Sequence, residues 1–281
     1  MTVTEFRSRT ANRKTVAIDS RCLVFTVWGP PGSTGKSSLS LNLAYEFSLL
    51  GKRVLLLDLD TTAPALAQLL GIKEVPAGLS AVARLIRQGR FNPEQLERLS
   101  VVLKHKKTSF NFLPGLASAT RWSEVSPETV SQILETAKQV FDVIICDVSS
   151  HLEEKLFNSQ HAISRNAVTR SAAHLADSVI CVVRGTEIGL ARYLSCFSII
   201  TELQKTRALV INISEPNSKL TAAIQALTKE KVFGFIPSDV SAFELAEATG
   251  LPLALVRRKS SARNAIAALA HKLLQWPHSV S

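Results

Sequence analysis

The sequence of 281 residues contains few cysteines and no long apolar run. Its four cysteines form no CxxC pair, which argues against a metal or redox site built on paired thiols. We expect Cys22, Cys146, Cys181 and Cys196 to be small core residues. No apolar run approaches the ~20 residues of a membrane-spanning helix, and the polar N-terminus lacks the apolar segment of a secretory signal. The composition therefore predicts a cytoplasmic protein.

Acidic residues are scarce relative to basic ones: 23 Asp and Glu stand against 33 Lys and Arg, which gives a formal charge of +10. Residues 1–20 are basic and have no periodic apolar pattern, so we expect a disordered basic tail. Two further basic clusters are Lys104, Lys106 and Lys107, and Arg257, Arg258 and Lys259. Such clusters bind nucleic acid or an anionic membrane surface in some proteins and only maintain solubility in others. The charge alone leaves both possibilities open.

Short apolar runs alternate with helical stretches from residue 21 onward. Predicted strands cover residues 23–28, 53–60, 109–115, 141–147, 178–183, 208–213 and 232–237. Predicted helices cover residues 36–50, 79–88, 126–140 and 262–274, and another begins at Asn92-Pro93. Strands that are apolar throughout and separated by helices are typical of a parallel sheet covered on both faces. The sequence therefore predicts one doubly wound α/β domain over residues 21–281, with a mostly parallel sheet.

The segment GPPGSTGKSS, residues 29–38, is the strongest functional signal. It lies between a predicted buried strand and a helix, where backbone N–H groups at the helix start can converge on an anion. Gly32 and Gly35 let the backbone approach phosphate oxygens closely. Lys36 would bring its charge to the β- and γ-phosphates of ATP, and the hydroxyl of Ser37 would ligate Mg²⁺. Further phosphate contacts are expected from Ser33, Thr34 and Ser38.

The loop departs from the strict pattern GxxxxGK[ST] at one position, because Pro30 stands where the pattern has glycine. Pro30 and Pro31 remove two N–H donors, but the donors nearest the phosphates would come from residues 32–38. The competing interpretation is a glycine-rich turn that only caps a helix and leaves Lys36 in solvent. The spacing and the flanking elements favour the phosphate loop.

Acidic residues lie at the ends of two predicted strands, where ligands bind in open α/β sheets. Asp147 ends the run FDVIIC and is the candidate Walker B aspartate, and Asp58 and Asp60 end the run RVLLL. We expect Ser37, Asp58 and Asp147 to serve Mg²⁺, and Asp60 to orient the attacking water. An isolated aspartate at a strand end is more often a helix cap. Three such carboxylates downstream of a phosphate loop favour the functional interpretation.

In their order along the chain, these segments resemble the MinD/ParA family of deviant-Walker ATPases over residues 22–275. The resemblance covers the strand, loop and helix up to Asp60, followed by TAPALAQLLG (62–71), LPG (113–115), FDVIICD (141–147), ADSVICVV (176–183), ALVIN (208–212) and FGFIPSDVSAFELAEATGLPL (233–253). It implies an ATP-driven homodimer that sandwiches two ATP molecules and works as a positioning switch. It further implies that Asn212 reads the edge of adenine and that Ile236 and Pro237 flank the base.

Three features differ from the family pattern. The family's signature lysine, which reaches the partner's phosphates, falls at position 31 and is Pro31 here. The Walker B strand continues as DVSS, without the usual proline. The sequence ends WPHSVS just after its last predicted helix, so we do not expect membrane anchoring through a C-terminal amphipathic helix of the MinD type. The chain resembles pilus-localisation proteins of the TadZ/CpaE type, which have eroded motifs of this kind, in keeping the fold while losing the signature lysine. It also resembles MinD-like proteins of actinobacteria.

These features leave two main hypotheses. One is a slow ATPase switch that positions a division site, a chromosome or a pilus. The other is a nucleotide-binding scaffold that recruits a protein partner without hydrolysis. Ligase chemistry on the same fold is a weaker third option, because no further substrate constellation is present. Binding of duplex DNA without sequence preference would suit the charge, with Arg257, Arg258, Lys259 and Arg263 as the candidate contacts.

Overall fold

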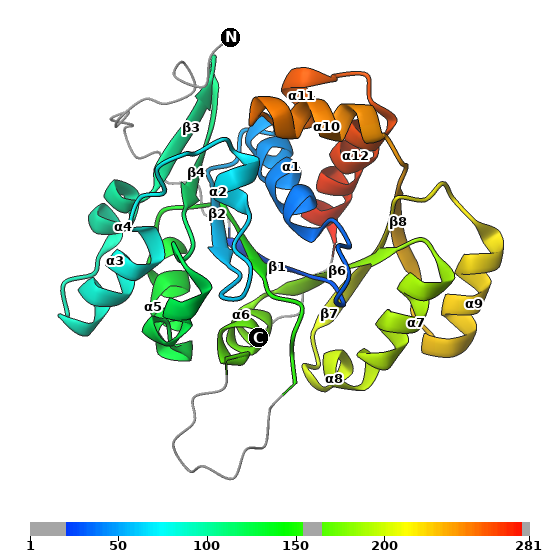
Figure 1. The fold of residues 1–281 in the computed structure, drawn as a ribbon, viewed down its shortest axis with the longest axis horizontal. Coiled ribbons are helices and arrows are strands. Elements are labelled where there is room, and N and C mark those ends of the chain that lie inside the picture. The colour runs from blue at the N-terminus through cyan, green and yellow to red at the C-terminus, as the bar shows by residue number, and fades with distance from the viewer. Residues whose placement is uncertain (1–20, 154–164, 277–281) are drawn as a thin grey trace.

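The structure is a computed structural model, and it describes residues 21–153 and 165–276. The expected basic tail, residues 1–20, lies outside the described residues. Strands, in chain order, are β1 (Leu23–Trp28), β2 (Val54–Leu59), β3 (Val101–His105), β4 (Thr108–Leu113), β5 (Val143–Val148), β6 (Ser178–Arg184), β7 (Thr206–Asn212) and β8 (Val232–Ile236). They form one sheet in the order β3-β4-β2-β5-β1-β6-β7-β8, which is parallel except for the β3–β4 pair (Figure 1). The predicted doubly wound, mostly parallel sheet is confirmed.

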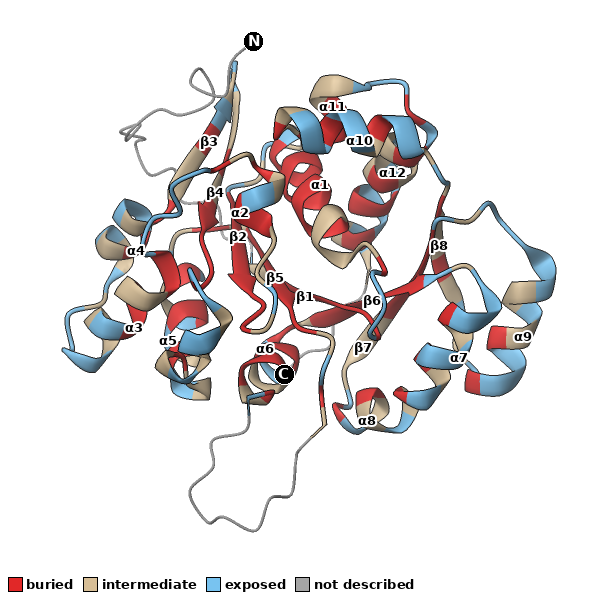
Figure 2. Ribbon diagram, viewed as in Figure 1, coloured by how far each residue is buried: buried red, intermediate tan, exposed pale blue. Residues whose placement is uncertain are grey.

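Helices cover both faces of this sheet (Figure 1). One face carries α1 (Lys36–Leu49), α2 (Leu66–Leu69), α10 (Val240–Thr249), α11 (Leu253–Val256) and α12 (Ser261–Gln275). The other carries α3 (Gly78–Arg87), α4 (Pro93–Leu99), α5 (Pro127–Ala137), α6 (Ala167–Leu175), α7 (Glu187–Ser195), α8 (Phe197–Glu202) and α9 (Ser218–Thr228). A hydrophobic cluster fills each interface, so the central strands are buried on both sides (Figure 2). None of the helices in residues 21–153 and 165–276 combines the length and the apolar character that a membrane span requires.

The helix after the phosphate loop, α1, is the most enclosed of the helices, with every residue from Leu39 to Ser48 buried. It lies between the sheet and the helices α11 and α12. Its polar residues find partners there: the Asn42 side chain accepts from the N–H of Leu253 (2.8 Å), and Glu46 forms a two-pronged ion pair with Arg263 (2.8 and 2.9 Å). Both contacts fix α1 relative to the C-terminal helices.

Sequence and structure differ mainly at one edge of the sheet. The predicted strand 109–115 is observed as β4, but its antiparallel partner β3 was not predicted. The hairpin turn consists of Lys106 and Lys107 and contains none of the glycine or asparagine that usually marks such a turn; Lys106 itself has a φ of 52°. The prediction for the cysteines holds for Cys146, Cys181 and Cys196, which are buried, whereas Cys22 is only half-buried.

Candidate functional site

The loop of residues 29–35 leaves the carboxyl end of β1 in the middle of the sheet and leads directly into α1. Its backbone has positive φ at Gly32 (119°), Ser33 (53°) and Gly35 (85°). Such angles suit glycine and cost other residues energy, which explains two of the loop's glycines. Gly35 is the N-cap of α1, so the free N–H groups of the helix start face the loop.

Asn212, at the end of β7, forms a hydrogen bond with the backbone of this loop. Its Nδ2 donates to the carbonyl oxygen of Thr34 (2.7 Å), and the side chain is buried. A Cβ atom at Gly35 would overlap this same Nδ2. Gly35 is therefore required both by its backbone angle and by the close approach of Asn212.

The loop lysine is held by a carboxylate. Nζ of Lys36 donates to Oδ2 of Asp60 (2.9 Å), and both side chains are largely buried. Burial opposes the charge of Lys36, but the carboxylates of Asp147 and Asp60 outweigh this and raise its pKa. Burial alone would raise the pKa of Asp60, yet Lys36 and donors from Thr62 and Ala63 lower it. The pair is charged, and the interpretation of Lys36 as a solvated side chain is wrong.

Two further carboxyl groups, those of Asp58 and Asp147, lie close enough to Lys36 to affect its pKa. Asp58 and Asp147 are register partners on the adjacent strands β2 and β5, and both are buried. Burial, and next the charge of Asp147, raises the pKa of Asp58 to about 8, although the N–H groups of Leu66 and Asp60 donate to it. Burial also raises the pKa of Asp147, against the opposing charge of Lys36. A cation at this site would lower both pKa values and favour the charged form of the two carboxyl groups.

Buried side-chain oxygens without a hydrogen-bond partner gather at this site. Within residues 21–153 and 165–276 there are three: Oγ1 of Thr34, Oγ1 of Thr61 and Oδ2 of Asp147. Thr34 belongs to the loop, Thr61 follows Asp60, and Asp147 ends β5. Buried polar atoms normally have partners, and exceptions commonly mark a place for an ion, water or ligand.

Comparison with known proteins agrees with this geometry. Residues 25–253 match the family model of the CobQ/CobB/MinD/ParA nucleotide-binding domain. The chain belongs to this family. It is 25% identical over 246 residues to an uncharacterized ATP-binding protein of Methanocaldococcus jannaschii, covering 86% of this chain and 84% of that protein. It is 26% identical over 166 residues to the septum site-determining protein MinD of Bacillus subtilis, covering 56% of this chain and 57% of MinD.

Solved structures share the fold. A ParA family ATPase from Chlorobium tepidum superposes with a TM-score of 0.76 at 19% identity, covering 90% of this chain and 99% of that one. MinD from Pyrococcus horikoshii, solved in complex with Mg-ADP, gives 0.69 at 18% identity, covering 90% and 96%. The fold is thus that of MinD/ParA-type P-loop ATPases.

The residues present in this CobQ/CobB/MinD/ParA domain fit a magnesium ion that is shared with phosphates. Among the described residues, no group of three or more His, Cys, Asp or Glu side chains is placed to hold a metal alone. Oδ2 of Asp147 is free, whereas Oδ1 accepts from Ser40 (3.0 Å). The side chain of Ser37 lowers the pKa of Asp147 and therefore lies close to this carboxylate. Ser37 and Asp147 are thus in place for an ion whose other ligands come from nucleotide and water.

The predicted base-binding residues lie together at the ends of β7 and β8. Asn212 and Ile236 are register partners, and both are buried. The side chain of Ile236 belongs to the hydrophobic core, so the half-buried Pro237 offers more surface to a ligand.

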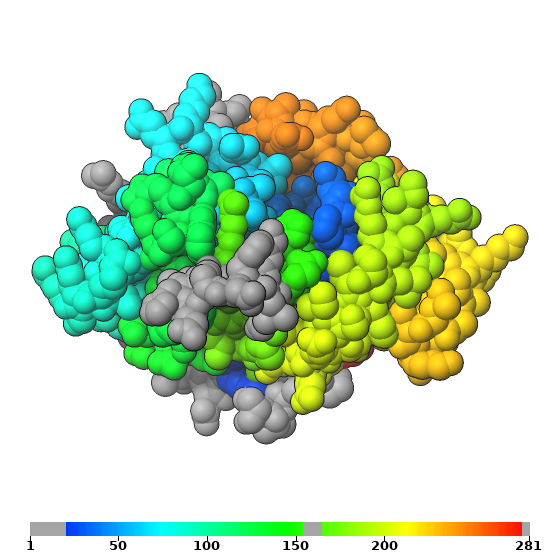
Figure 3. Space-filling model, turned by 60° about the horizontal axis from the view of Figure 1, so that its bottom comes forward, coloured from blue at the N-terminus to red at the C-terminus, as the bar shows by residue number. Residues whose placement is uncertain are grey.

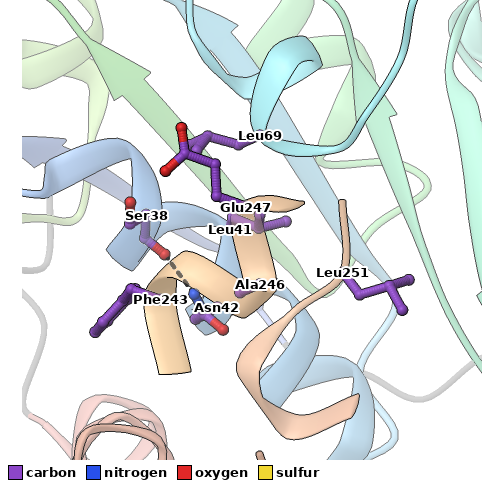
Figure 4. Close-up of a pocket in the computed structure, with 8 residues that line it drawn as sticks. All are labelled: Ser38, Leu41, Asn42, Leu69, Phe243, Ala246, Glu247 and Leu251. Atoms are coloured by element: carbon purple, nitrogen blue, oxygen red, sulfur yellow. Dashed lines mark hydrogen bonds between the residues drawn. The ribbon is translucent and has the colours of Figure 1, made fainter. Parts of the chain in front are cut away.

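A small pocket adjoins α1 one turn beyond the loop (Figure 4). Its lining residues are Ser38, Leu41, Asn42, Leu69, Phe243, Ala246, Glu247 and Leu251. It contains a carboxylate and no cation, and the Ser38 carbonyl already accepts from Asn42 (2.8 Å). This pocket is therefore unsuited to phosphates, which the loop is built to hold.

Three residues of the site were not predicted from the sequence. Ser40 bonds Asp147 from one helical turn after Lys36, a spacing that alone does not identify a ligand. A Cβ atom at Gly115 would lie 2.9 Å from the Asp58 carboxyl carbon, so this glycine makes room for the carboxylate. Arg192 of α7 reaches the loop from a distant part of the chain, which no local pattern reveals.

Proposed function

We propose that this protein binds Mg-ATP in the loop of residues 29–38, hydrolyses it slowly, and acts as a switch that positions cellular machinery. The observation that carries the proposal is the arrangement of Lys36 with the buried Asp58, Asp60 and Asp147 at the loop, where Oγ1 of Thr34 and Oδ2 of Asp147 have no hydrogen-bond partner. Family membership supports nucleotide binding. The relatives named above include septum site-determining and ParA family proteins, which supports a positioning role.

Each residue has a role in this proposal. The N–H groups of the loop and helix start would hold the phosphates, from Gly32, Ser33, Thr34, Gly35, Lys36, Ser37 and Ser38. Ser37 would ligate Mg²⁺, and Asp147 and Asp58 would hold its water ligands. Lys36 would leave Asp60 for the phosphates, and the Asp60 carboxylate released in this way would orient the attacking water.

The base would bind beside the loop. Because Nδ2 of Asn212 already donates to Thr34, recognition of adenine would fall to Oδ1, which can accept from the exocyclic amino group. Pro237 and the backbone of Ile236 would flank the ring.

The proposal includes an ATP-dependent homodimer and a basic surface for duplex DNA. Arg257, Arg258 and Lys259 are exposed in the turn before α12. Arg263 is engaged by Glu46, so we assign DNA contacts to the other three. Binding through phosphates alone would weaken steeply with added salt.

Steady-state ATP turnover distinguishes the switch from the scaffold hypothesis. Turnover is measured with Mg²⁺, for wild type and for Lys36→Ala, with and without duplex DNA at two salt concentrations. The switch predicts slow hydrolysis that is lost in Lys36→Ala, and stimulation by DNA that decreases with salt. Nucleotide binding without turnover under every condition would instead select the scaffold, for which the departures at Pro31 and after Asp147 are the motivating features.

A further inference from the structure

The loop carries little positive charge of its own. Residues 29–35 contain no basic side chain, and Lys36 is shared with Asp60. Three aspartates lie behind the loop, whereas a triphosphate adds several negative charges in front of it. A second cation near the loop would therefore strengthen phosphate binding considerably.

One arginine lies at the open end of this loop. A Cβ atom at Gly32 would overlap Nη1 of Arg192 and lie 2.9 Å from its Cζ. The guanidinium therefore occupies the space that a side chain at position 32 would fill. Figure 3 shows the same neighbourhood on the surface, where the yellow-green segment that contains α7 borders the blue segment that contains the loop. Pro31, Gly32 and Ser33 are exposed, and so is Arg192.

The helix that carries Arg192 is fixed firmly to the sheet. The adjacent Tyr193 is fully buried, its hydroxyl donates to Glu230, and Glu230 also pairs with Arg207 of β7. The ring of Tyr193 packs against Trp28, the residue that precedes the loop, with centroids 6.5 Å apart. The position of Arg192 is thus determined by a buried anchor one residue away.

We propose that Arg192 is a phosphate-contacting residue that binds the terminal phosphate of ATP at the open end of the loop. Lys36 and the start of α1 form the inner end of the loop. Gly32 lies three residues before the N-cap of α1, at the opposite, open end. A planar guanidinium with several donors suits the terminal phosphate, which carries the most unshared oxygens. The inference rests on the proposed nucleotide site and makes α7 the element that distinguishes ATP from ADP.

The test compares the affinities for AMP-PNP and ADP, each with Mg²⁺, by titration calorimetry. Arg192→Ala should weaken AMP-PNP binding roughly 10- to 100-fold, as expected for loss of a charged hydrogen bond, and leave ADP binding nearly unchanged. Arg192→Lys should lose part of this preference. Arg90→Ala, an exposed arginine in the turn after α3, removes the same charge elsewhere and should behave as wild type.

Two outcomes would overturn the inference. An unchanged AMP-PNP affinity in Arg192→Ala would show that the side chain does not touch the phosphate. Equal weakening of AMP-PNP and ADP would show that Arg192 only supports the loop. Wild-type protein that binds neither nucleotide would be a failure of the proposed function itself, which this design separates from the other two results.

Discussion

Gly35 joins three requirements of the site in one residue: the left-handed backbone of the loop, the cap of α1 and the contact with Asn212. Replacement by alanine adds both backbone strain and an overlap with Nδ2 of Asn212. We expect Gly35→Ala to lower the free energy of unfolding by about 2–3 kcal/mol and to abolish ATP binding. Urea unfolding and nucleotide titration measure the two effects.

A second glycine separates strain from overlap. Gly89 also has a positive φ (64°), but a Cβ atom there would meet nothing within 4 Å. Gly89→Ala should therefore cost only about 1 kcal/mol and leave ATP binding intact. Equal losses in the two variants would contradict the role given to Asn212.

At the residue scale, the sequence was informative about chemistry and silent about pairing. Lys36, Asp58, Asp60 and Asp147 could be proposed because a glycine-rich loop and strand ends mark the place of ligands. The Lys36–Asp60 pair depends on side-chain conformation, and Arg192 meets the loop through the packing of α7. Neither leaves a local pattern in the sequence.

At the scale of elements, the starts of β2 and β5 are joined by an ion pair. The carboxylate of Asp142 accepts from the N–H of Arg53 (2.8 Å) and from its Nη2 (2.7 Å). Partial burial raises the pKa of Asp142, but the contacts with Arg53 outweigh burial and lower it overall. A carboxyl whose pKa is lowered by folding stabilises the protein above its unfolded pKa, and this contribution is lost as pH falls through the folded pKa.

Asp142→Asn should therefore destabilise the protein at pH 7 by roughly 0.5–1 kcal/mol, a modest effect because Arg53 is half exposed. The difference from wild type should shrink as the pH falls below about 4, where the wild-type carboxyl takes up its proton. Urea unfolding over this pH range measures it. Glu74→Gln, an exposed acid, is the control for net charge, and a gap that stays constant at acid pH would refute the assignment.

The elements themselves were largely predictable, for a physical reason. The central strands are buried on both faces and thus apolar throughout, and helix starts such as Asn92-Pro93 and Ser126-Pro127 carry their own caps, both of which form. The edge strand β3 mixes exposed lysine with apolar residues and turns through Lys106, so it lacks both signals. The pairing of β3 with β4 could therefore not be predicted from either signal.

At the scale of the whole molecule, the loop lies between two hydrophobic layers that meet at the sheet. Helix α1 is enclosed by one layer, and Arg192 extends from an element of the other. A ligand at the loop would thus contact both layers and stabilise the fold as a unit, because binding to the folded state alone raises the free energy of unfolding.

Thermal unfolding with and without Mg-ATP tests this central claim most directly. Wild type should be stabilised by about 2.7 kcal/mol at a ligand concentration of 100 times Kd. Lys36→Ala should show almost no shift, and Lys73→Ala, an exposed lysine, should match wild type. The unliganded midpoint of each variant controls for the loss of the Lys36–Asp60 pair. No shift in wild type, or an equal shift in Lys36→Ala, would contradict the assignment of this loop as the nucleotide site.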